Sequence, residues 1–183
     1  VGRIVLQNET AVNVAPAMPF DVCGAMSQGM IGYHMQQGLT KALRARGNHT
    51  GAATVVTQVV VDQNDKAFLN PSKPIGPFYS EAEAKKLQSE KGYSVKEDAG
   101  RGWRRVVASP MPVEIVELPE VKCLIDGGFV VITVGGGGIP VVRNEHGDLV
   151  GTAAVIDKDL ASERLAEDLD ADALLILTAV EQV

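Results

Sequence analysis

The sequence has few of the residue types that build disulfide frameworks, metal centres and histidine-based catalytic sites. Among its 183 residues are only two cysteines, Cys23 and Cys123, and three histidines. The cysteines lie far apart without metal-ligand spacing, and we interpret them as free thiols in a reducing cytosol. His34 falls in an expected helix, and His49 and His146 fall in turns, so neither a Ser-His-Asp triad nor a zinc site is indicated.

Long apolar runs and an excess of positive charge are also missing. No apolar segment is long enough to span a bilayer, and the N-terminus does not have the pattern of a secretion signal. The net charge of -6 and pI near 5.1 argue against a nucleic-acid or anionic-membrane partner. With 45% hydrophobic residues, the chain is expected to be globular and cytoplasmic.

Both ends differ from what we expect of a complete domain. Val1, Ile4 and Val5 already follow a helical period, with no cap or methionine before them. The chain closes on "ALLIL" (173–177), which reads as a buried strand. We therefore expect residues 1–183 to be a piece of a larger domain.

Apolar segments alternate in a way that is typical of an α/β fold. A long helix is expected from Asp21 to Arg46, and its three glycines indicate close packing against a neighbouring element or subunit. Strands are expected at 52–62, 129–134, 153–156 and 173–177, further helices at 121–126 and from 159 onward, and a hairpin at 141–151. Such alternation implies a largely parallel sheet with helices on its faces, which binds ligands at the carboxyl ends of its strands.

A change in composition predicts a small protruding lobe at about residues 64–104, called the lobe below. The segment 70–78 holds three prolines and a glycine and is expected to be a stiff loop. Ser80 and Glu83 form a capping-box pattern that opens a helix, and Gly92 closes it. A Gly-Arg-Gly turn follows.

Four consecutive glycines at 135–138, called the glycine bend below, follow one of the expected strands. Bare backbone N–H groups can approach an anion closely there, which favours a phosphate or carboxylate site. A tight turn is the alternative reading, although two glycines would suffice for it. Pro140 replaces the last glycine of a G-x-G-x-x-G pattern, and without a Gly-Lys dipeptide a P-loop is excluded.

Charged residues stand at the start of the last expected helix, where Lys158 lies between Asp157 and Asp159. A cation is unfavourable at a helix N-terminus by up to about 1 kcal/mol, which suggests a role toward an anion. Either the two aspartates hold Lys158 toward a phosphoryl group, or the lysine forms a surface salt bridge. Asp159 is expected to be the N-cap, and Asp157 could be a solvated charge.

Two further basic positions have a chemical and a plainer interpretation. Lys73 stands between two prolines whose rigidity would fix its direction, although a lone loop lysine is usually only solvated. Arg101 and Arg104 flank Trp103 and could clamp an anion, but arginines that decorate an exposed hairpin are commoner.

In order and spacing, the motifs resemble those of the carbamate kinases, within the amino-acid kinase family. The matching stretches are "DVCGAMSQGMIGY", "TQVVVD", "NPSKPIGPFY", "KEDAGRGWRRVVASP", "GGGGIPVV", "AVIDKDLASE" and "DADALLILT". The resemblance implies an open three-layer α/β/α sandwich with a mainly parallel sheet, usually homodimeric. It also implies reversible phosphoryl transfer between carbamoyl phosphate and ADP, giving ATP and carbamate in arginine breakdown, with Mg²⁺.

The resemblance also assigns roles to residues. Lys158 would neutralise the moving phosphoryl group, Asp159 would orient lysines around it, and Lys73 would reach over the carbamoyl phosphate from the lobe. Backbone donors near the substrate would come from Gly135, Gly136, Gly137 and Gly138. The nucleotide would lie along Asp157, Thr178, Ala179 and Val180. No metal-ligating side chain is assigned.

The chain also departs from the family pattern. It starts after two glycine-rich phosphate loops of its relatives and stops before a further catalytic lysine, so the 183 residues alone are expected to be poorly active. Two alternatives remain open. One is a non-catalytic dimerising or nucleotide-binding fragment. The other is an amino-acid kinase acting on an acyl carboxylate such as acetylglutamate, against which the lobe sequence argues.

Overall fold

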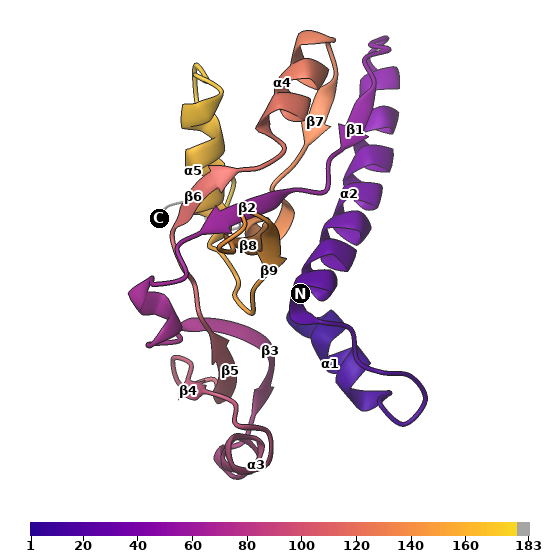
Figure 1. Cartoon of the computed structure of the whole chain (residues 1–183). Coiled ribbons are helices and arrows are strands. Elements are labelled where there is room, and N and C mark those ends of the chain that lie inside the picture. The colour runs from indigo at the N-terminus through magenta and orange to yellow at the C-terminus, as the bar shows by residue number, and fades with distance from the viewer. Residues whose placement is uncertain (179–183) are drawn as a thin grey trace.

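The computed structural model describes residues 1–178 (Figure 1). The chain begins with the helices α1 (Gly2–Thr10) and α2 (Phe20–Arg44). Ile4 and Val5 of α1 are buried against Cys23 of α2. The apolar spacing that predicted the first helix therefore also defines its packing face. Among the described residues, no helix combines the length and the apolar character that crossing a membrane requires.

Short strands form the centre of the α/β part. One sheet has the order β6 (Pro112–Ile115), β2 (Gln58–Val61), β8 (Ile139–Arg143), β9 (Leu149–Gly151). Strands β2 and β8 are parallel, whereas β6 and β9 pair antiparallel at the edges. Beside this sheet, β1 (Ala52–Thr54) and β7 (Val130–Ile132) form a parallel pair. The hairpin predicted at 141–151 is confirmed.

Helices cover the strands from both sides. Helix α2 packs against β1, β8 and the glycine bend, while α5 (Lys158–Asp168) packs against β6. In Figure 1 these two helices lie on opposite sides of β2 and β8, and α4 (Leu118–Asp126) lies against β7. Val59, Ile115 and Ile156 are almost fully buried between the layers. The predicted α/β class is confirmed.

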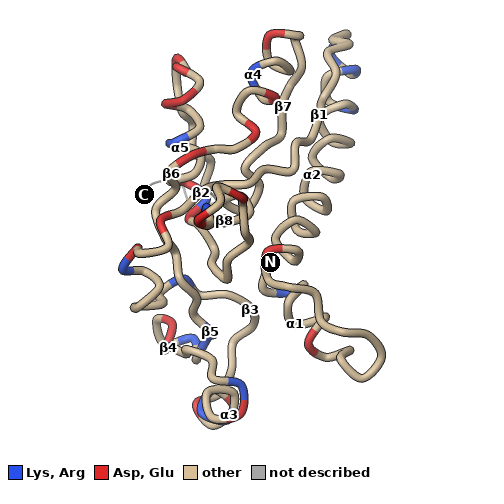
Figure 2. Tube along the Cα trace, in the orientation of Figure 1, with Lys and Arg blue, Asp and Glu red and all other residues tan. Residues whose placement is uncertain are grey.

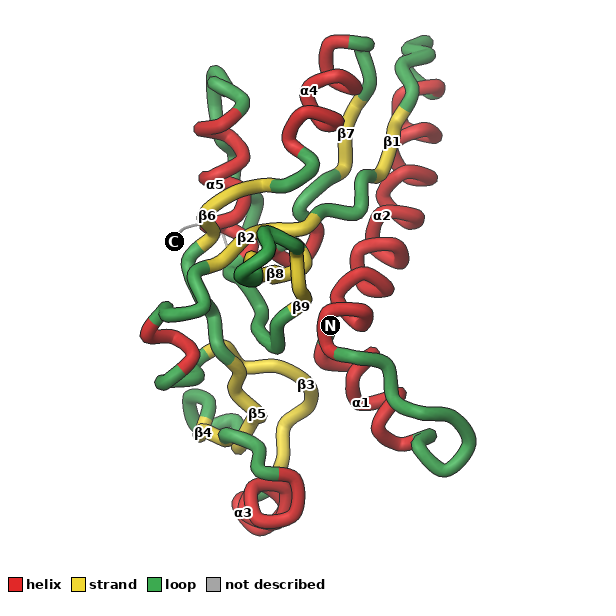
Figure 3. The backbone as a smooth tube through the Cα atoms, in the orientation of Figure 1, coloured by secondary structure: helices red, strands yellow, loops and turns green. Residues whose placement is uncertain are grey.

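The single strand predicted at 52–62 is wrong, because residues 55–57 separate β1 from β2 (Figure 3). Gln28 of α2 explains the break. Its side chain accepts the backbone N–H of Thr57 at 2.7 Å and donates to the carbonyl oxygen of Thr57 at 2.9 Å. The N–H of Thr57, which a neighbouring strand could satisfy, is thus satisfied by a buried side chain, while the carbonyl oxygen of Thr57 also accepts the backbone N–H of Ile139 at 2.8 Å.

Two other predicted strands are also wrong. Segment 153–156 makes only one isolated bridge, from Ala154 to Ala108. Segment 173–177 pairs with no strand among the described residues, and its leucines are exposed. An apolar run indicates that a segment favours burial, but a strand forms only where a partner accepts its hydrogen bonds.

The lobe contains its own three-stranded antiparallel sheet, which lies at the bottom of Figure 1 beside one helix. The sheet order is β3 (Lys73–Tyr79), β5 (Trp103–Val107), β4 (Val95–Glu97), and the helix is α3 (Glu81–Lys91). The predicted capping box of Ser80 and Glu83 at the start of α3 and the predicted stop at Gly92 are both confirmed, and Gly92 has a left-handed conformation. Both charge signs occur along the lobe (Figure 2). The predicted end of the lobe, Arg104, falls inside β5. The limits 64–104 of the lobe stay a prediction.

The predicted stiff loop at 70–78 is wrong, since most of it forms strand β3. In the register of the sheet, Lys73 lies opposite Val107 and Pro74 lies opposite Val106. Strand β3 is an edge strand, which is where β-sheets tolerate proline. The extended φ of proline also suits a strand.

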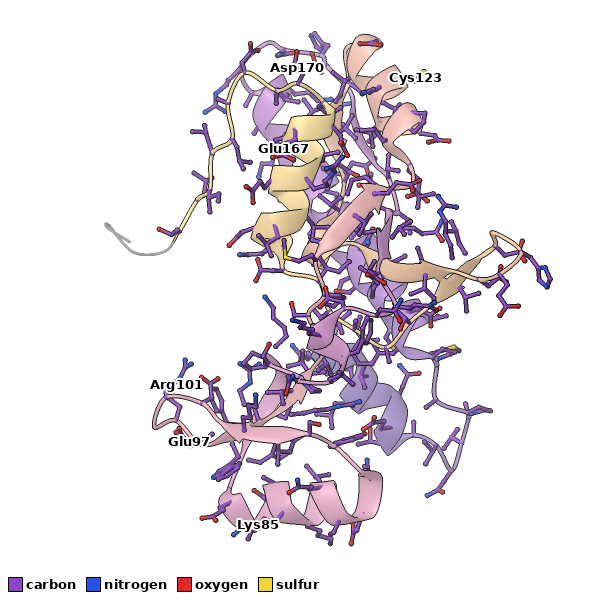
Figure 4. All side chains as sticks on the ribbon, turned by 60° about the vertical axis from the view of Figure 1, so that its left-hand side comes forward. Lys85, Glu97, Arg101, Cys123, Glu167 and Asp170 are labelled. Carbon is purple, nitrogen blue, oxygen red and sulfur yellow. The ribbon has the colours of Figure 1, made fainter. Side chains whose placement is uncertain are left out.

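Both cysteines are free thiols, as predicted, while the reducing compartment stays a prediction. Cys23 is buried in α2, and this burial raises the pKa of its thiol. Cys123 lies at the surface on α4, as Figure 4 shows.

Candidate active site

Two of the predicted lysines are held at the same helix end by neighbouring aspartates. The ammonium of Lys73, at the start of β3, forms an ion pair with Oδ2 of Asp157. The Nζ of Lys158 donates to Oδ1 of Asp159 at 2.8 Å. Asp157 directly precedes the first residue of α5, so its ion pair places Lys73 of the lobe at the N-terminus of this helix.

Asp157 also caps α5. Its Oδ1 accepts the backbone N–H of Asp159 at 2.9 Å, and its own backbone is extended. The prediction that Asp159 is the N-cap is therefore wrong, because the N-cap lies two residues earlier, at Asp157, and the helix begins at Lys158. The bond from Lys73, and next the bond from the Asp159 N–H, lower the pKa of Asp157. Asp157 is thus an anion at neutral pH.

Lys158 has a nearby partner but remains open to solvent. Its side chain is 68% exposed, and the hydrogen bond to Asp159 raises its pKa. This is the surface salt bridge that the sequence left open as an alternative. An exposed, charged amine at a helix N-terminus can also exchange its carboxylate for another anion, so the catalytic role stays a prediction. The carboxylate of Asp159 accepts its hydrogen bond from Lys158 and not from Lys73.

The glycine bend packs against the segment that leads to these charges. Gly136, Gly137 and Gly138 all have positive φ, between 66° and 97°. A Cβ atom on Gly137 would collide with the carbonyl oxygen of Ile156, and one on Gly138 would collide with Val59. The glycines are therefore required by backbone conformation and close approach. Their service as anion donors stays a prediction.

A cavity of about 250 Å³ lies between the glycine bend and the lobe. Its lining includes Gly24 and Ser27 of α2, Pro74 and Gly76 of β3, and the side chain of Arg104. Val155 lines it as well, two residues before Asp157. Larger hollows of about 640, 480 and 340 Å³ border α2, but no described residue of the lobe or of 157–159 lines them. We therefore take the smaller cavity as the candidate site.

The sequence profile described as "Amino acid kinase family" matches residues 8–183. The chain belongs to the amino acid kinase family. It is 58% identical to a carbamate kinase of Clostridium perfringens, and the alignment covers all of this chain and 59% of that protein. The chain thus spans less than two thirds of the length of this relative.

Solved structures of other amino acid kinases confirm the fold. Carbamate kinase from Giardia lamblia bound to citric acid matches 98% of this chain and 58% of its own, with a TM-score of 0.92 and 52% identity. The same enzyme bound to AMP-PNP matches 98% of this chain and 57% of its own, with a TM-score of 0.85 and 51% identity. The predicted amino-acid kinase fold, a sheet between helical layers, is therefore confirmed.

Several site residues of this amino acid kinase were missed or left undecided from the sequence. Gln28 and Ser27 are buried polar residues in α2, and polar residues within a helix normally indicate its solvent face. Arg104 lines the cavity, whereas Arg101 is exposed, and local spacing could not distinguish the two. Thr178 is exposed at the end of the described chain. Ala179 and Val180 lie outside the described residues.

The described part of the chain offers no ready-made metal centre. Within residues 1–178, no group of three or more histidine, cysteine, aspartate or glutamate side chains converges to hold a metal ion. The aspartates nearest the candidate site are each bonded to a lysine. These residues therefore do not fit a dedicated metal site.

Proposed function

We propose that this protein is a carbamate kinase, which transfers a phosphoryl group between carbamoyl phosphate and ADP to give ATP and carbamate. One observation carries the proposal: Lys73 of the lobe pairs with Asp157 and Lys158 of α5 pairs with Asp159, so both lysines are tied to the N-terminus of α5, near a cavity lined by glycines. The similarity to carbamate kinases over the whole chain supports it. The reaction would supply ATP during arginine breakdown.

The proposed step needs positioning and charge neutralisation more than a base. The bond between phosphorus and the carbamoyl oxygen breaks, and an oxygen of the ADP β-phosphate forms the new bond to phosphorus. Carbamate leaves with the electron pair of the broken bond, so no proton has to move. Lys73 and Lys158 would stabilise the charge on the phosphoryl oxygens, and the N–H groups of Gly135 to Gly138 would add donors.

The nucleotide partner is proposed from the relatives. The Giardia lamblia enzyme is described as bound to AMP-PNP, an ATP analogue. We propose ATP and ADP for this protein, with the nucleotide near Asp157 and Thr178. Mg²⁺ would accompany the nucleotide, held mainly by phosphate oxygens and water as this ion prefers. No catalytic step is assigned to it.

A second copy of the chain is the proposed protein partner. Met26, Met30 and Tyr33 are exposed on α2. A Cβ built on Gly29 or Gly38 of the same helix would meet no described atom within 4 Å, whereas Gly32 packs closely against Thr54. We propose that a homodimer covers this apolar surface. A cytoplasmic location is proposed because both cysteines are free.

The direct test measures ATP formation by the complete natural protein from carbamoyl phosphate and ADP. We expect turnover with this pair and none from acetylglutamyl phosphate and ADP. Turnover with the acyl phosphate alone would replace the proposal with another amino acid kinase activity. Nucleotide binding without turnover on either substrate would instead indicate a non-catalytic protein.

A further inference from the structure

One charged side chain stands out in the cavity between the glycine bend and the lobe. Glycine backbone, aliphatic groups and the hydroxyl of Ser27 form most of the lining, and among the described residues Arg104 contributes its only ionisable side chain. The α-amino group of Val1, which donates to Ser27 at 3.3 Å, also lies at this cavity. The side chain of Arg104 is 22% exposed. The lysines assigned to the phosphoryl group, Lys73 and Lys158, do not line the cavity themselves. A side chain other than these two lysines must therefore contact the part of a substrate that lies in the cavity.

The guanidinium of Arg104 is fixed in place but not saturated. One terminal nitrogen donates to Oδ2 of Asp98 at 3.2 Å, and the other donates to the carbonyl oxygen of Gly76 at 3.0 Å. The ring of Phe78 lies 5.1 Å from Cζ. The Nε–H is buried without a partner among the described residues. Because this Nε is buried, a ligand in the cavity would meet the terminal nitrogens, each of which carries two N–H groups and donates one of them in the bonds described above.

The size of the cavity limits what can reach this arginine. At about 250 Å³ it is smaller than most cavities that hold drug-sized ligands. Pro74, which follows Lys73, and Val155, which precedes Asp157 by two residues, both line it. A small substrate could thus have one end in the cavity and its other end beside the lysines. A guanidinium is well suited to a planar carboxylate-like group.

We propose that Arg104 binds the carbamoyl end of carbamoyl phosphate, and the carboxylate of carbamate, while Lys73 and Lys158 take the phosphoryl end. This assignment rests on the proposed function and makes Arg104 the residue that selects the acceptor group. The phosphoryl lysines would act on any acyl phosphate. The small cavity and its single fork of donors favour a compact carboxyl compound.

Arg101 provides a matched control. It pairs with the same aspartate, Asp98, at 2.9 Å, and its Cζ also lies 5.1 Å from the ring of Phe78. However, its side chain is 64% exposed and does not line the cavity. Figure 4 shows Arg101 at the outer end of the lobe turn. Replacing Arg101 therefore removes the same kinds of partner without touching the cavity.

The test compares Arg104→Met, Arg104→Lys and Arg101→Met in the complete natural protein. KM and kcat are measured separately for carbamoyl phosphate and for ADP. We expect Arg104→Met to raise KM for carbamoyl phosphate about 10- to 100-fold, the loss typical of a hydrogen bond to a charged group. KM for ADP should change less than about twofold. Arg101→Met should leave both KM values within about twofold.

Each outcome bears on the assignment in a distinct way. Equal behaviour of Arg104→Met and Arg101→Met overturns it while leaving the proposed function intact. A rise in both KM values for Arg104→Met also overturns it, because the arginine would then only hold β3 in place. If the methionine variant does not fold, the same KM values are measured for Arg104→Lys, because an ammonium lacks the paired N–H donors of a guanidinium. Failure of the unaltered protein to make ATP defeats the proposed function and this assignment together.

Discussion

At the scale of single residues, Asp157 uses its two carboxylate oxygens for different partners. Oδ2 receives the ammonium of Lys73, and Oδ1 receives the backbone N–H of Asp159. The first contact links α5 to β3, and the second starts α5. Because the two contacts use separate atoms, substitutions can remove one without the other.

Asp157→Asn should remove the ion pair and retain the cap, since asparagine caps helices as well as aspartate does. The lowered pKa of Asp157 means that its ionised form stabilises the folded state above the unfolded pKa, near 4. This contribution disappears as the pH falls through the lower folded-state pKa. The loss of stability in Asp157→Asn should therefore be present at neutral pH and vanish in acid.

Urea unfolding of the unaltered protein and of Asp157→Asn across this pH range measures the effect. Asp157→Ala serves as the control that loses the cap too, and it should cost about 1 kcal/mol more than the asparagine variant. A stability difference between the unaltered protein and Asp157→Asn that stays constant from neutral to acid pH would show that the ion pair contributes nothing.

Lys158→Met should reduce turnover of the complete natural protein by roughly 100-fold or more while leaving its fold unchanged. Lys85→Met is the matched control, because Lys85 is 67% exposed and pairs with Glu81 at 2.6 Å. It lies on α3 in the lobe, as Figure 4 shows. Turnover of the control should not change. A loss below about threefold for Lys158→Met would mean that this lysine is only a salt-bridge partner.

At the scale of elements, the glycine bend offers a comparison between backbone strain and steric collision. Gly136 and Gly137 both have positive φ, of 66° and 97°. Nothing lies within 4 Å of a Cβ added to Gly136, whereas one added to Gly137 would collide with the backbone of Ile156. Gly136→Ala should cost about 1–2 kcal/mol in the free energy of unfolding, from backbone conformation alone.

Gly137→Ala should destabilise the protein more than Gly136→Ala, because Ile156 must also move. The comparison is made by urea unfolding of the two variants. Equal losses would mean that the bend can shift away from Ile156 without cost. The same displacement should disturb the segment that carries Asp157, so turnover is measured alongside stability.

A second inter-element contact joins α1 to the lobe. Glu9 of α1 accepts hydrogen bonds from the hydroxyl of Tyr93, from Lys91 at 3.3 Å and from Arg105 at 3.3 Å. The Cζ of Arg105 lies 3.7 Å from the ring centre of Tyr93. Burial, and next the bond to Glu9, raise the pKa of Tyr93 to about 12.

The hydroxyl of Tyr93 should therefore titrate near pH 12 in the folded protein, as measured by ultraviolet absorbance with Tyr93→Phe as the blank. A raised pKa favours the neutral phenol, so its stabilising effect is complete below the ordinary pKa near 10 and is lost as the pH rises toward 12. Glu9→Gln should lower the midpoint without restoring the ordinary value, because burial is the larger cause. An unchanged midpoint would contradict the contact.

Some elements could be predicted from local sequence because their signals are local. The Ser80–Glu83 box and Gly92 give both ends of α3, since capping depends on residues within one helical turn. Strand β3 could not be predicted, because prolines exclude a strand only where N–H groups must pair, and edge position depends on the whole sheet. The break before β2 depends on Gln28, which is 29 residues away from Thr57.

At the scale of the whole molecule, the candidate site illustrates the same limit. The residue types for phosphoryl chemistry could be named from the sequence, but Lys73 and Asp157 are 84 residues apart and only folding joins them. The resemblance to carbamate kinases supplied the direction of Lys73 toward this site. Neither source distinguished Arg104 from Arg101, because that difference is one of burial.

The proposed homodimer predicts that a charge on the exposed side of α2 will weaken association. Met30→Lys should shift the protein toward monomer, because a lysine placed in an apolar interface loses hydration without a partner. Met111→Lys is the matched control, since the two methionines are 53% and 55% exposed and Met111 lies away from α2. Light scattering after size-exclusion chromatography gives the masses. A monomeric unaltered protein, or dimeric Met30→Lys, would contradict the proposal.

The ion pair between Lys73 and Asp157 also has a consequence for ligand affinity. An anion that reaches Lys73 does not find a vacant cation; it exchanges with a tethered carboxylate that already occupies the ammonium. The net gain is the difference between two electrostatic contacts, so a simple anion gains less at Lys73 than it would at an unpaired ammonium. Only a ligand with further contacts, such as those offered in the neighbouring cavity, gains enough to displace the carboxylate. The carboxylate of Asp157 thus competes with non-specific anions for Lys73.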